Sequence, residues 1–293
     1  MRMSINHSTT LDLGEGTRVS SPKREAGTRT RKKRPSNPSG RRGGRVRPLA
    51  LGVSSLVLLV LLWQLEYTLK LVPALFLPSP ANVGKAIGDI VTGGQFLTDL
   101  RVSGAEFGLG LGLSIVIGTI LGVLSGWYKD VDDFLRPLVA GLNSMPHLAV
   151  IPLLILIFGI GTTPKVAVVM LSCVVVIVMN TASGVQNCDR NLMRLARSFG
   201  ASDWDTIRTV VLPSVVPSFM TGLRISVGRA VSAVVVAELF ASRAGLGNIV
   251  ANAQGSFNMP TMYAAIVILT LIGILLTQVA SWFERRIQRW QLH

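Results

Sequence analysis

The polar connector formed by residues 186–213 reads QNCDRNLMRLARSFGASDWDTIRTVVLP and lies between two long apolar runs. It divides into two short helical patterns around Gly200, a residue type that can adopt positive φ and stop a helix. In the first pattern, apolar residues recur at the i, i+3, i+4, i+7 spacing of one helix face. They are Leu192, Leu195, Ala196 and Phe199. Another face carries arginines at similar spacing, namely Arg190, Arg194 and Arg197.

The second helical pattern begins at Ser202, which offers an N-cap. Asp205 stands three positions later, as in a capping box with Asp in place of Glu. An apolar face follows, made of Trp204, Ile207 and Val211, and Leu212-Pro213 is expected to end the pattern. The connector therefore predicts a compact helix-turn-helix. Its apolar surface has two interpretations: a partner docks on it, or both faces pack on the ends of neighbouring helices.

Six apolar runs surround this connector, and each approaches the roughly 20 residues that a membrane-spanning helix needs. They cover about 49–68, 104–127, 138–159, 165–183, 214–240 and 262–283. Pro146 and Pro152 interrupt the third run, and Arg224 and Arg229 lie inside the fifth. The expected fold is an all-α integral membrane protein with a bundle of six transmembrane helices.

Glycines are unusually frequent in the second run. They recur every four residues in two rows, Gly104, Gly108, Gly112 and Gly118, Gly122, Gly126. Lipid gives no hydrophobic drive for helices to associate, so rows of small residues that let backbones approach are typical of packed membrane helices. We expect this helix to be surrounded by other helices.

Composition supports a membrane protein. Hydrophobic residues make up 49% of the 293 residues and charged residues 15%, against about 25% charged in soluble domains. The net charge of +14 is concentrated in residues 1–48, which hold 13 of the 29 basic residues. That segment has almost no apolar clusters, so it is predicted to be a disordered tail. Its basic patches suit anionic lipid or nucleic acid, but the simpler interpretation is a solvated cytoplasmic tail.

The distribution of Lys and Arg predicts the topology. With the N-terminus inside, the cytoplasmic segments hold 22 basic residues and the external segments five. This asymmetry obeys the positive-inside rule, so both termini are expected in the cytoplasm. The connector 186–213 is then cytoplasmic.

Other candidate chemical groups favour structural interpretations. Cys173 and Cys188 are too few for a disulfide framework and are predicted to be free thiols. His147 has no neighbour at metal-ligand spacing, so an interior histidine is favoured and no metal site is predicted. The acidic residues near position 131 are interpreted as a solvated turn; they are Asp130, Asp132 and Asp133. No nucleophile–base pattern points to an enzyme.

The connector resembles the cytoplasmic signature of permease subunits from binding-protein-dependent ABC importers. That family's pattern is Glu-Ala-Ala, three residues, Gly, nine residues, then Ile-x-Leu-Pro. Here the corresponding residues are Arg194-Leu195-Ala196, Gly200 and Val210-Val211-Leu212-Pro213, with the same spacing. Arg194 replaces Glu, Leu195 replaces Ala and Val210 replaces Ile, so an ion pair made by the family's Glu is not expected.

Shorter motifs resemble the nitrate, sulfonate and taurine branch of the same family, and the resemblance covers residues 49–290. They are Leu77-Pro78-Ser79-Pro80, Gly222-Leu223-Arg224-Ile225 with Gly228-Arg229-Ala230, Val236-Ala237-Glu238, and Gly245-Leu246-Gly247 followed by Ala251-Asn252-Ala253. The basic tail is not part of the resemblance.

The resemblance implies a transport role in a bacterial inner membrane. In this family two permease subunits work with two ATPase subunits and an external solute-binding protein. It implies that residues 186–213 form a coupling loop that contacts the ATPase, and that the permease pair is a homodimer. The implied coupling-loop residues are Arg194, Leu195, Ala196, Gly200, Ala201, Trp204, Ile207, Leu212 and Pro213. Trp204 and Ile207 are expected to fill the ATPase cleft, Gly200 to set the angle between the two helices, and Leu212-Pro213 to join the loop to the fifth run. ATP would bind the partner, since the only Gly-Lys pair here, Gly84-Lys85, lacks the rest of a P-loop.

Charged residues in the fifth run are candidates for a solute path, because charges at membrane depth usually face a bundle interior or water. They are Arg224, Arg229 and Glu238. Cationic side chains suit an anionic solute such as a sulfonate. The alternatives are snorkelling of Arg224 to the interface and a place for Glu238 at the outer end. An ATP-independent transporter or channel is the second functional hypothesis, and a membrane-embedded enzyme the third.

Overall fold

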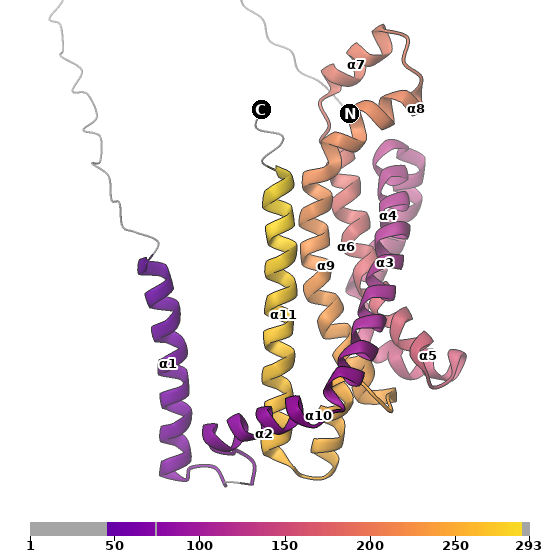
Figure 1. The fold of residues 1–293 in the computed structure, drawn as a ribbon. Coiled ribbons are helices and arrows are strands. Elements are labelled where there is room, and N and C mark those ends of the chain that lie inside the picture. The colour runs from indigo at the N-terminus through magenta and orange to yellow at the C-terminus, as the bar shows by residue number, and fades with distance from the viewer. Residues whose placement is uncertain (1–45, 74, 289–293) are drawn as a thin grey trace, which may run out of the picture. The chain divides into compact units, whose positions relative to one another are not determined.

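The computed structural model describes residues 46–73 and 75–288, and the unit considered below comprises residues 51–288. The described residues form helices and no strands. The helices are α1 Val46–Leu69, α2 Pro80–Thr92, α3 Phe96–Trp127, α4 Lys129–Ser144, the 3₁₀ helix η1 His147–Val150, α5 Ile151–Phe158, α6 Thr162–Gln186, α7 Arg190–Ser198, α8 Asp203–Thr206, the π-helix η2 Ile207–Val211, α9 Leu212–Ala241, α10 Leu246–Gly255 and α11 Met259–Gln288 (Figure 1). The predicted all-α class is confirmed.

Four of the described helices are long and apolar enough to cross a membrane. They are Leu51–Leu69, Phe96–Trp127, Thr162–Gln186 and Met259–Gln288. α9 has sufficient length at 30 residues but carries the charged side chains noted above. The predicted tail differs at its end, because α1 already begins at Val46; residues 1–45 lie outside the described part of the chain.

The third predicted span is not one helix. α4 ends at Ser144, and Met145 has φ −72° and ψ 132°, the extended backbone that a following proline favours. The predicted interruption at Pro146 is therefore present. The predicted interruption at Pro152 is wrong, because this proline lies in the first turn of α5, where the missing N–H costs no hydrogen bond.

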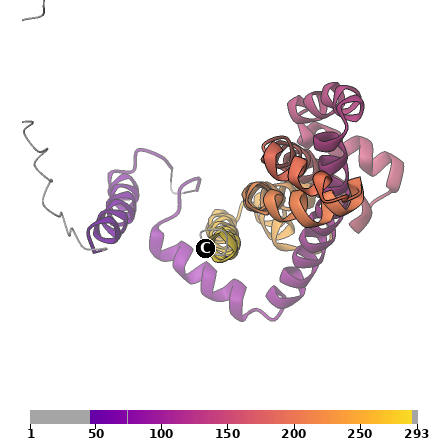
Figure 2. The same ribbon diagram turned by 90° about the horizontal axis from the view of Figure 1, so that it is seen from above.

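The helices α2 and α10 lie outside the predicted spans, and α4 overlaps only the beginning of the third. The acidic residues interpreted as a solvated turn belong to the first turns of α4. Their carboxylates are stabilised there by the positive end of the helix dipole. α2 begins at the N-cap Ser79, whose hydroxyl accepts a hydrogen bond from the Asn82 N–H at 3.2 Å. It runs crosswise to α11 and buries Val83 against Ala264 (Figures 1 and 2).

Glycines let α3 approach α6 closely. A Cβ added at Gly118 would lie 2.8 Å from the Cβ of Ile177, and one at Gly122 would lie 2.6 Å from the Cβ of Thr181. Gly126 meets Val185 in the same way, so one of the two predicted rows is a packing surface. The other row is not: Cβ atoms at Gly104, Gly108 and Gly112 would meet nothing within 4 Å.

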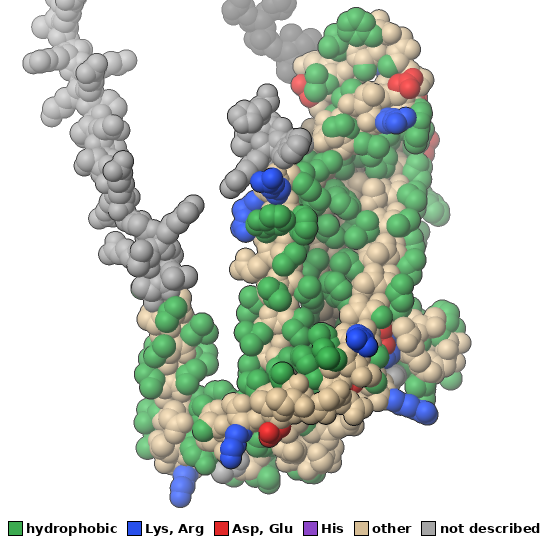
Figure 3. All heavy atoms as spheres, in the orientation of Figure 1, with side chains coloured by type: hydrophobic (Ala, Val, Ile, Leu, Met, Phe, Trp, Pro, Cys, Tyr) green, Lys and Arg blue, Asp and Glu red, His purple; other side chains and the backbone are tan. Residues whose placement is uncertain are grey.

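The main core lies where α6 packs between α3 and α9. Fully buried side chains include Val169 and Cys173 of α6 and Ala230 and Ala237 of α9, and α5 adds Ile151. On the face shown in Figure 3, apolar side chains lie along the outer sides of the helices, whereas most charged side chains lie toward the helix ends. This distribution suits a protein whose flanks contact lipid rather than water.

A single methyl group at Gly122 tests the α3–α6 contact. Gly122→Ala should lower the free energy of unfolding by about 1–3 kcal/mol, because the new Cβ overlaps Thr181. The matched Gly108→Ala adds the same atom to the same helix in open space, so it should be neutral or slightly stabilising. Thermal unfolding of the purified proteins in detergent measures both, and equal stability of the two variants would contradict the packing described.

Candidate functional site

The connector 186–213 adopts the predicted helix-turn-helix. α7 ends at Ser198, and Gly200 has φ +81°, a left-handed conformation that favours glycine. The turn closes by two backbone hydrogen bonds, from the Gly200 N–H to the Arg197 carbonyl at 3.0 Å and from the Ala201 N–H to the Ala196 carbonyl at 3.2 Å. The angle between the two short helices is therefore set by this turn.

The predicted capping box is also present. The Asp205 N–H donates to the Ser202 hydroxyl at 3.2 Å, and the Ser202 N–H donates to the Asp205 carboxylate at 3.2 Å. The Ser202 hydroxyl also donates to the Asp205 carboxylate at 2.5 Å. This bond, followed by the one from the Ser202 N–H, holds the pKa of the Asp205 carboxyl below its usual value. The cap is therefore intact at neutral pH, and its contribution is lost only as the pH falls through that lowered pKa.

The loop does not end at Leu212-Pro213 as predicted. α8, the π-helix η2 and α9 follow one another without a break. Pro213 lies in the first turn of α9, and a proline has no N–H to donate to the helix. The π-helix η2 immediately before α9 changes the hydrogen-bonding pattern at this point. The loop's second helix is therefore continuous with a long helix of the bundle.

The two interpretations of the apolar faces apply to different parts of the loop. Val211 is fully buried with Val185 and Cys188, and Ile207 is half-buried, so this part packs on the bundle. In contrast, Phe199 is 85% exposed and Trp204 is 68% exposed. Leu192 and Leu195 are also exposed.

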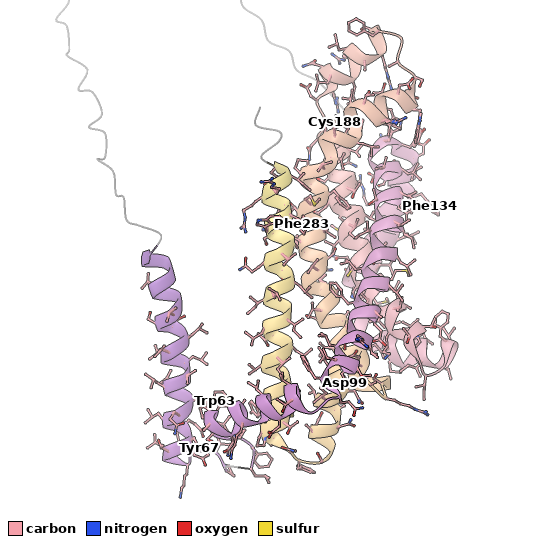
Figure 4. All side chains as sticks on the ribbon, in the orientation of Figure 1. Trp63, Tyr67, Asp99, Phe134, Cys188 and Phe283 are labelled. Carbon is pink, nitrogen blue, oxygen red and sulfur yellow. The ribbon has the colours of Figure 1, made fainter. Side chains whose placement is uncertain are left out.

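Both cysteines are free, as predicted. Cys188 was placed in a polar loop by its sequence context, but it lies buried at the junction of α6 and α7 (Figure 4). Cys173 lies in the main core.

The three residues predicted to line a solute path have different surroundings. Arg224 is partly exposed, and its Nε lies 3.3 Å from the Glu284 carboxylate of α11. Arg229 is exposed on α9. Glu238 is only 1% exposed, and its carboxylate accepts hydrogen bonds inside the subunit.

Glu238 belongs to a buried network at the end of the bundle opposite α7 and α8 (Figure 1). Its carboxylate accepts from the Ser103 hydroxyl at 2.6 Å and from the Gly247 N–H at 2.6 Å. The Ser103 oxygen in turn accepts from the Leu246 N–H at 2.9 Å. Nearby, the Asp99 carboxylate accepts from the Gly245 N–H at 2.7 Å (Figure 4). The network thus joins α3 and α9 to the start of α10.

An ion pair extends this network to α6. The Lys165 ammonium contacts the Glu106 carboxylate, and both side chains are almost completely buried. Glu106 also interacts with the carboxyl of Glu238. Lys165 therefore interacts electrostatically with two buried acids. Lys165 further donates to the Ser242 hydroxyl at 3.0 Å. Sequence reasoning missed Glu106 and Lys165, since single charged residues near the ends of apolar runs resemble exposed interfacial residues.

No group of His, Cys, Asp or Glu that could hold a metal ion occurs among the described residues. His147 lies in η1, half-buried between α4 and α5. Asp132 forms an ion pair with Arg136 and accepts from Ser125 at 2.7 Å.

Comparison with known proteins defines the class of protein. The family model described as binding-protein-dependent transport system inner membrane component matches residues 114–289. The chain therefore belongs to this family of membrane permeases of ABC transporters.

Curated relatives agree with this assignment. The chain is 30% identical over 233 residues to the putative aliphatic sulfonates transport permease protein SsuC of Bacillus subtilis, covering 80% of this chain and 84% of the relative. It is 31% identical over 250 residues to the taurine transport system permease protein TauC of Escherichia coli, covering 83% and 90%. It is 34% identical over 244 residues to the riboflavin transport system permease protein RibX of Chloroflexus aurantiacus, covering 83% and 91%.

A solved structure shows the same fold. It is a chain of a bacterial ABC transporter involved in the import of the acidic polysaccharide alginate, with a TM-score of 0.61 and 13% identity. The match covers 83% of this chain and 97% of that chain.

The buried Lys165–Glu106 pair can be tested by a double-mutant cycle. Lys165→Met or Glu106→Gln alone should each destabilise the protein by about 3–5 kcal/mol, because each leaves an uncompensated buried partner. The double variant should lose less than the sum of the two.

The exposed pair Arg197–Asp203 provides the matched control, since the same kinds of change there should cost less than about 1 kcal/mol. Thermal unfolding in detergent measures all variants. Simple additivity at Lys165 and Glu106 would show that the two side chains are not coupled.

Proposed function

We propose that this chain carries a small anionic solute across a bacterial plasma membrane as one of two identical permease subunits, driven by ATP hydrolysis on a separate partner. The observation that carries the proposal is the exposed apolar surface of the coupling loop, residues 186–213. That surface consists of Phe199, Trp204, Leu192 and Leu195. Because α7 and α8 are polar elsewhere, these side chains fit a partner's cleft better than lipid.

The geometry of the loop suits a mechanical linkage. The turn at Gly200 and the capping box at Ser202 hold α7 and α8 at a fixed angle. Since α8, η2 and α9 are continuous, a displacement of α8 by a closing ATPase dimer is transmitted directly to α9. α9 packs on α6 through the main core, so its movement changes the shape of the bundle.

The remaining partners follow from the family and from the charge distribution. The loop end of the bundle faces the cytoplasm with both termini, which agrees with Arg285 and Arg286 at the end of α11. The opposite end, with α2 and α10, receives the solute from an external binding protein. The chain itself binds no cofactor and no nucleic acid; ATP binds the partner.

The substrate class is supported by two observations. Two of the relatives are named as sulfonate and taurine permeases, and Arg229 provides an exposed cation on α9, the helix that the coupling loop moves. Arg224 and Glu238 already have partners within the subunit, so we assign them positioning roles in the resting conformation. Riboflavin, the solute in the name of a third relative, is larger and is the competing solute class.

The backbone conformation of Gly200 tests the linkage. Gly200→Val should strongly reduce transport, because a β-branched residue at φ +81° is strained and shifts the turn. Gly200→Asn should retain most of it, since Asn tolerates this conformation and a Cβ at this position meets nothing within 4 Å. The measurement is ATP-dependent taurine uptake by proteoliposomes that hold the permease, its ATPase and its binding protein.

Uptake by the permease alone, without ATPase or ATP, would refute the proposed mechanism and favour the ATP-independent alternative. ATPase activity that responds to the binding protein while taurine is not taken up would retain the mechanism and reject this solute.

The exposed aromatic side chains test the docking surface. Phe199→Ala with Trp204→Ala should weaken association with the ATPase by about 30-fold or more, as loss of a buried aromatic anchor does. Phe134→Ala is the matched control, because Phe134 is 70% exposed on α4 but lies outside the loop (Figure 4). Co-purification of the ATPase from detergent measures the effect, and undiminished recovery with the double variant would contradict docking at this surface.

A further inference from the structure

The arginine stripe of α7 is not part of the proposed docking surface. Arg190, Arg194 and Arg197 follow one another at i, i+4 and i+7, which places them on one side of the helix. At about 100° per residue, the exposed apolar side chains lie on the opposite side. The stripe therefore needs an explanation of its own.

The three arginines line a hollow between α7 and the adjoining ends of α3 and α6. It has a volume of about 430 Å³. Trp127 of α3, Gln186 at the end of α6 and Met193 of α7 complete most of its wall. No acidic residue occurs among the described residues that line it.

The positive charge in this hollow is largely uncompensated within the described part of the chain. Arg197 lies 3.2 Å from the Asp203 carboxylate, in an exposed pair. Arg190 and Arg194 have no ion-pair partner among the described residues. The nearest acid in sequence, Asp189, caps α7 by accepting a hydrogen bond from the Asn191 N–H at 2.8 Å. Three like charges on one side of a short helix repel one another unless an anion lies between them.

We propose that this hollow binds a phosphate group, held by Arg190 and Arg194 with Gln186 and Arg197 beside them. Guanidinium groups bind phosphate oxygens through paired, charge-assisted hydrogen bonds. The Gln186 side-chain amide supplies an uncharged hydrogen-bond donor. Trp127 is a residue type enriched at the membrane–water interface. The phosphate comes either from the headgroup of an anionic lipid or from a soluble phosphate, because α6 leaves the membrane at this level.

The location gives a bound phosphate a defined effect. It would bridge α7 to the ends of α3 and α6, on the side of the loop away from the docking surface. Arg194 stands where the family signature has Glu, so the site is a property of this chain rather than of the signature. The inference does not depend on the solute or on docking of the ATPase.

The test uses the full chain in nanodiscs and measures hydrogen exchange of the α7 amides. Two lipid compositions are compared, phosphatidylcholine alone and phosphatidylcholine mixed with phosphatidylglycerol. The phosphatidylcholine sample is also titrated with inorganic phosphate against chloride at equal ionic strength. We expect exchange to slow by about tenfold in at least one arm, as two charge-assisted hydrogen bonds would produce.

The charge-neutral variant Arg190→Gln/Arg194→Gln should lose this protection, and Arg285→Gln/Arg286→Gln, which removes the same charge from the end of α11, should keep it. Protection by phosphate over chloride identifies a soluble anion, and protection by phosphatidylglycerol alone identifies a headgroup. Wild-type exchange that is the same in every arm overturns the proposal even if the double variant fails to fold. Equal loss of protection in both double variants also overturns it.

Discussion

The close approach of α3 to α6 is the constraint on which the bundle depends. Lipid supplies no hydrophobic drive between helices, so the contact must come from packing. Gly118, Gly122 and Gly126 remove the side chains that would hold α3 away from Ile177, Thr181 and Val185. With α3 in this place, α6 is enclosed between α3 and α9. The neighbouring ends of the three helices then lie together at each end of the bundle.

The two ends of this three-helix core differ: one holds buried charged side chains and the other exposed aromatic side chains. At one end, the buried charges of Glu106 and Lys165 pair with each other inside the subunit, which makes that end costly to separate. At the other end, Phe199 and Trp204 remain exposed on a short, well-capped loop. α9 connects the ends, because its first turns are continuous with the loop and its last turns carry Glu238. Under the proposed linkage, the loop end receives the displacement and the buried network resists it at the other end.

Sequence patterns were sufficient for features that depend on local chemistry. Gly200 and Ser202 predicted the turn and the cap, because positive φ and an N-cap are properties of one or two residues. Long apolar runs predicted α1, α3, α6, α9 and α11 to within a few residues at most ends, with α3 beginning eight residues earlier than expected. The helices α2 and α10 were missed, since they are neither apolar throughout nor long, and α4 was predicted only where it overlaps the run 138–159.

The amino-acid sequence by itself determined that the chain is helical, lies in a membrane and carries a bent loop, because periodicity and residue conformation are encoded locally. Only the tertiary structure decided which glycine row is a contact, that Glu238 is enclosed by Ser103 and Gly247, and that α8 continues into α9. These outcomes depend on which side of a helix meets a neighbour. The sequence pattern of a glycine row or of a single charged residue is the same whether that residue faces lipid, water or another helix.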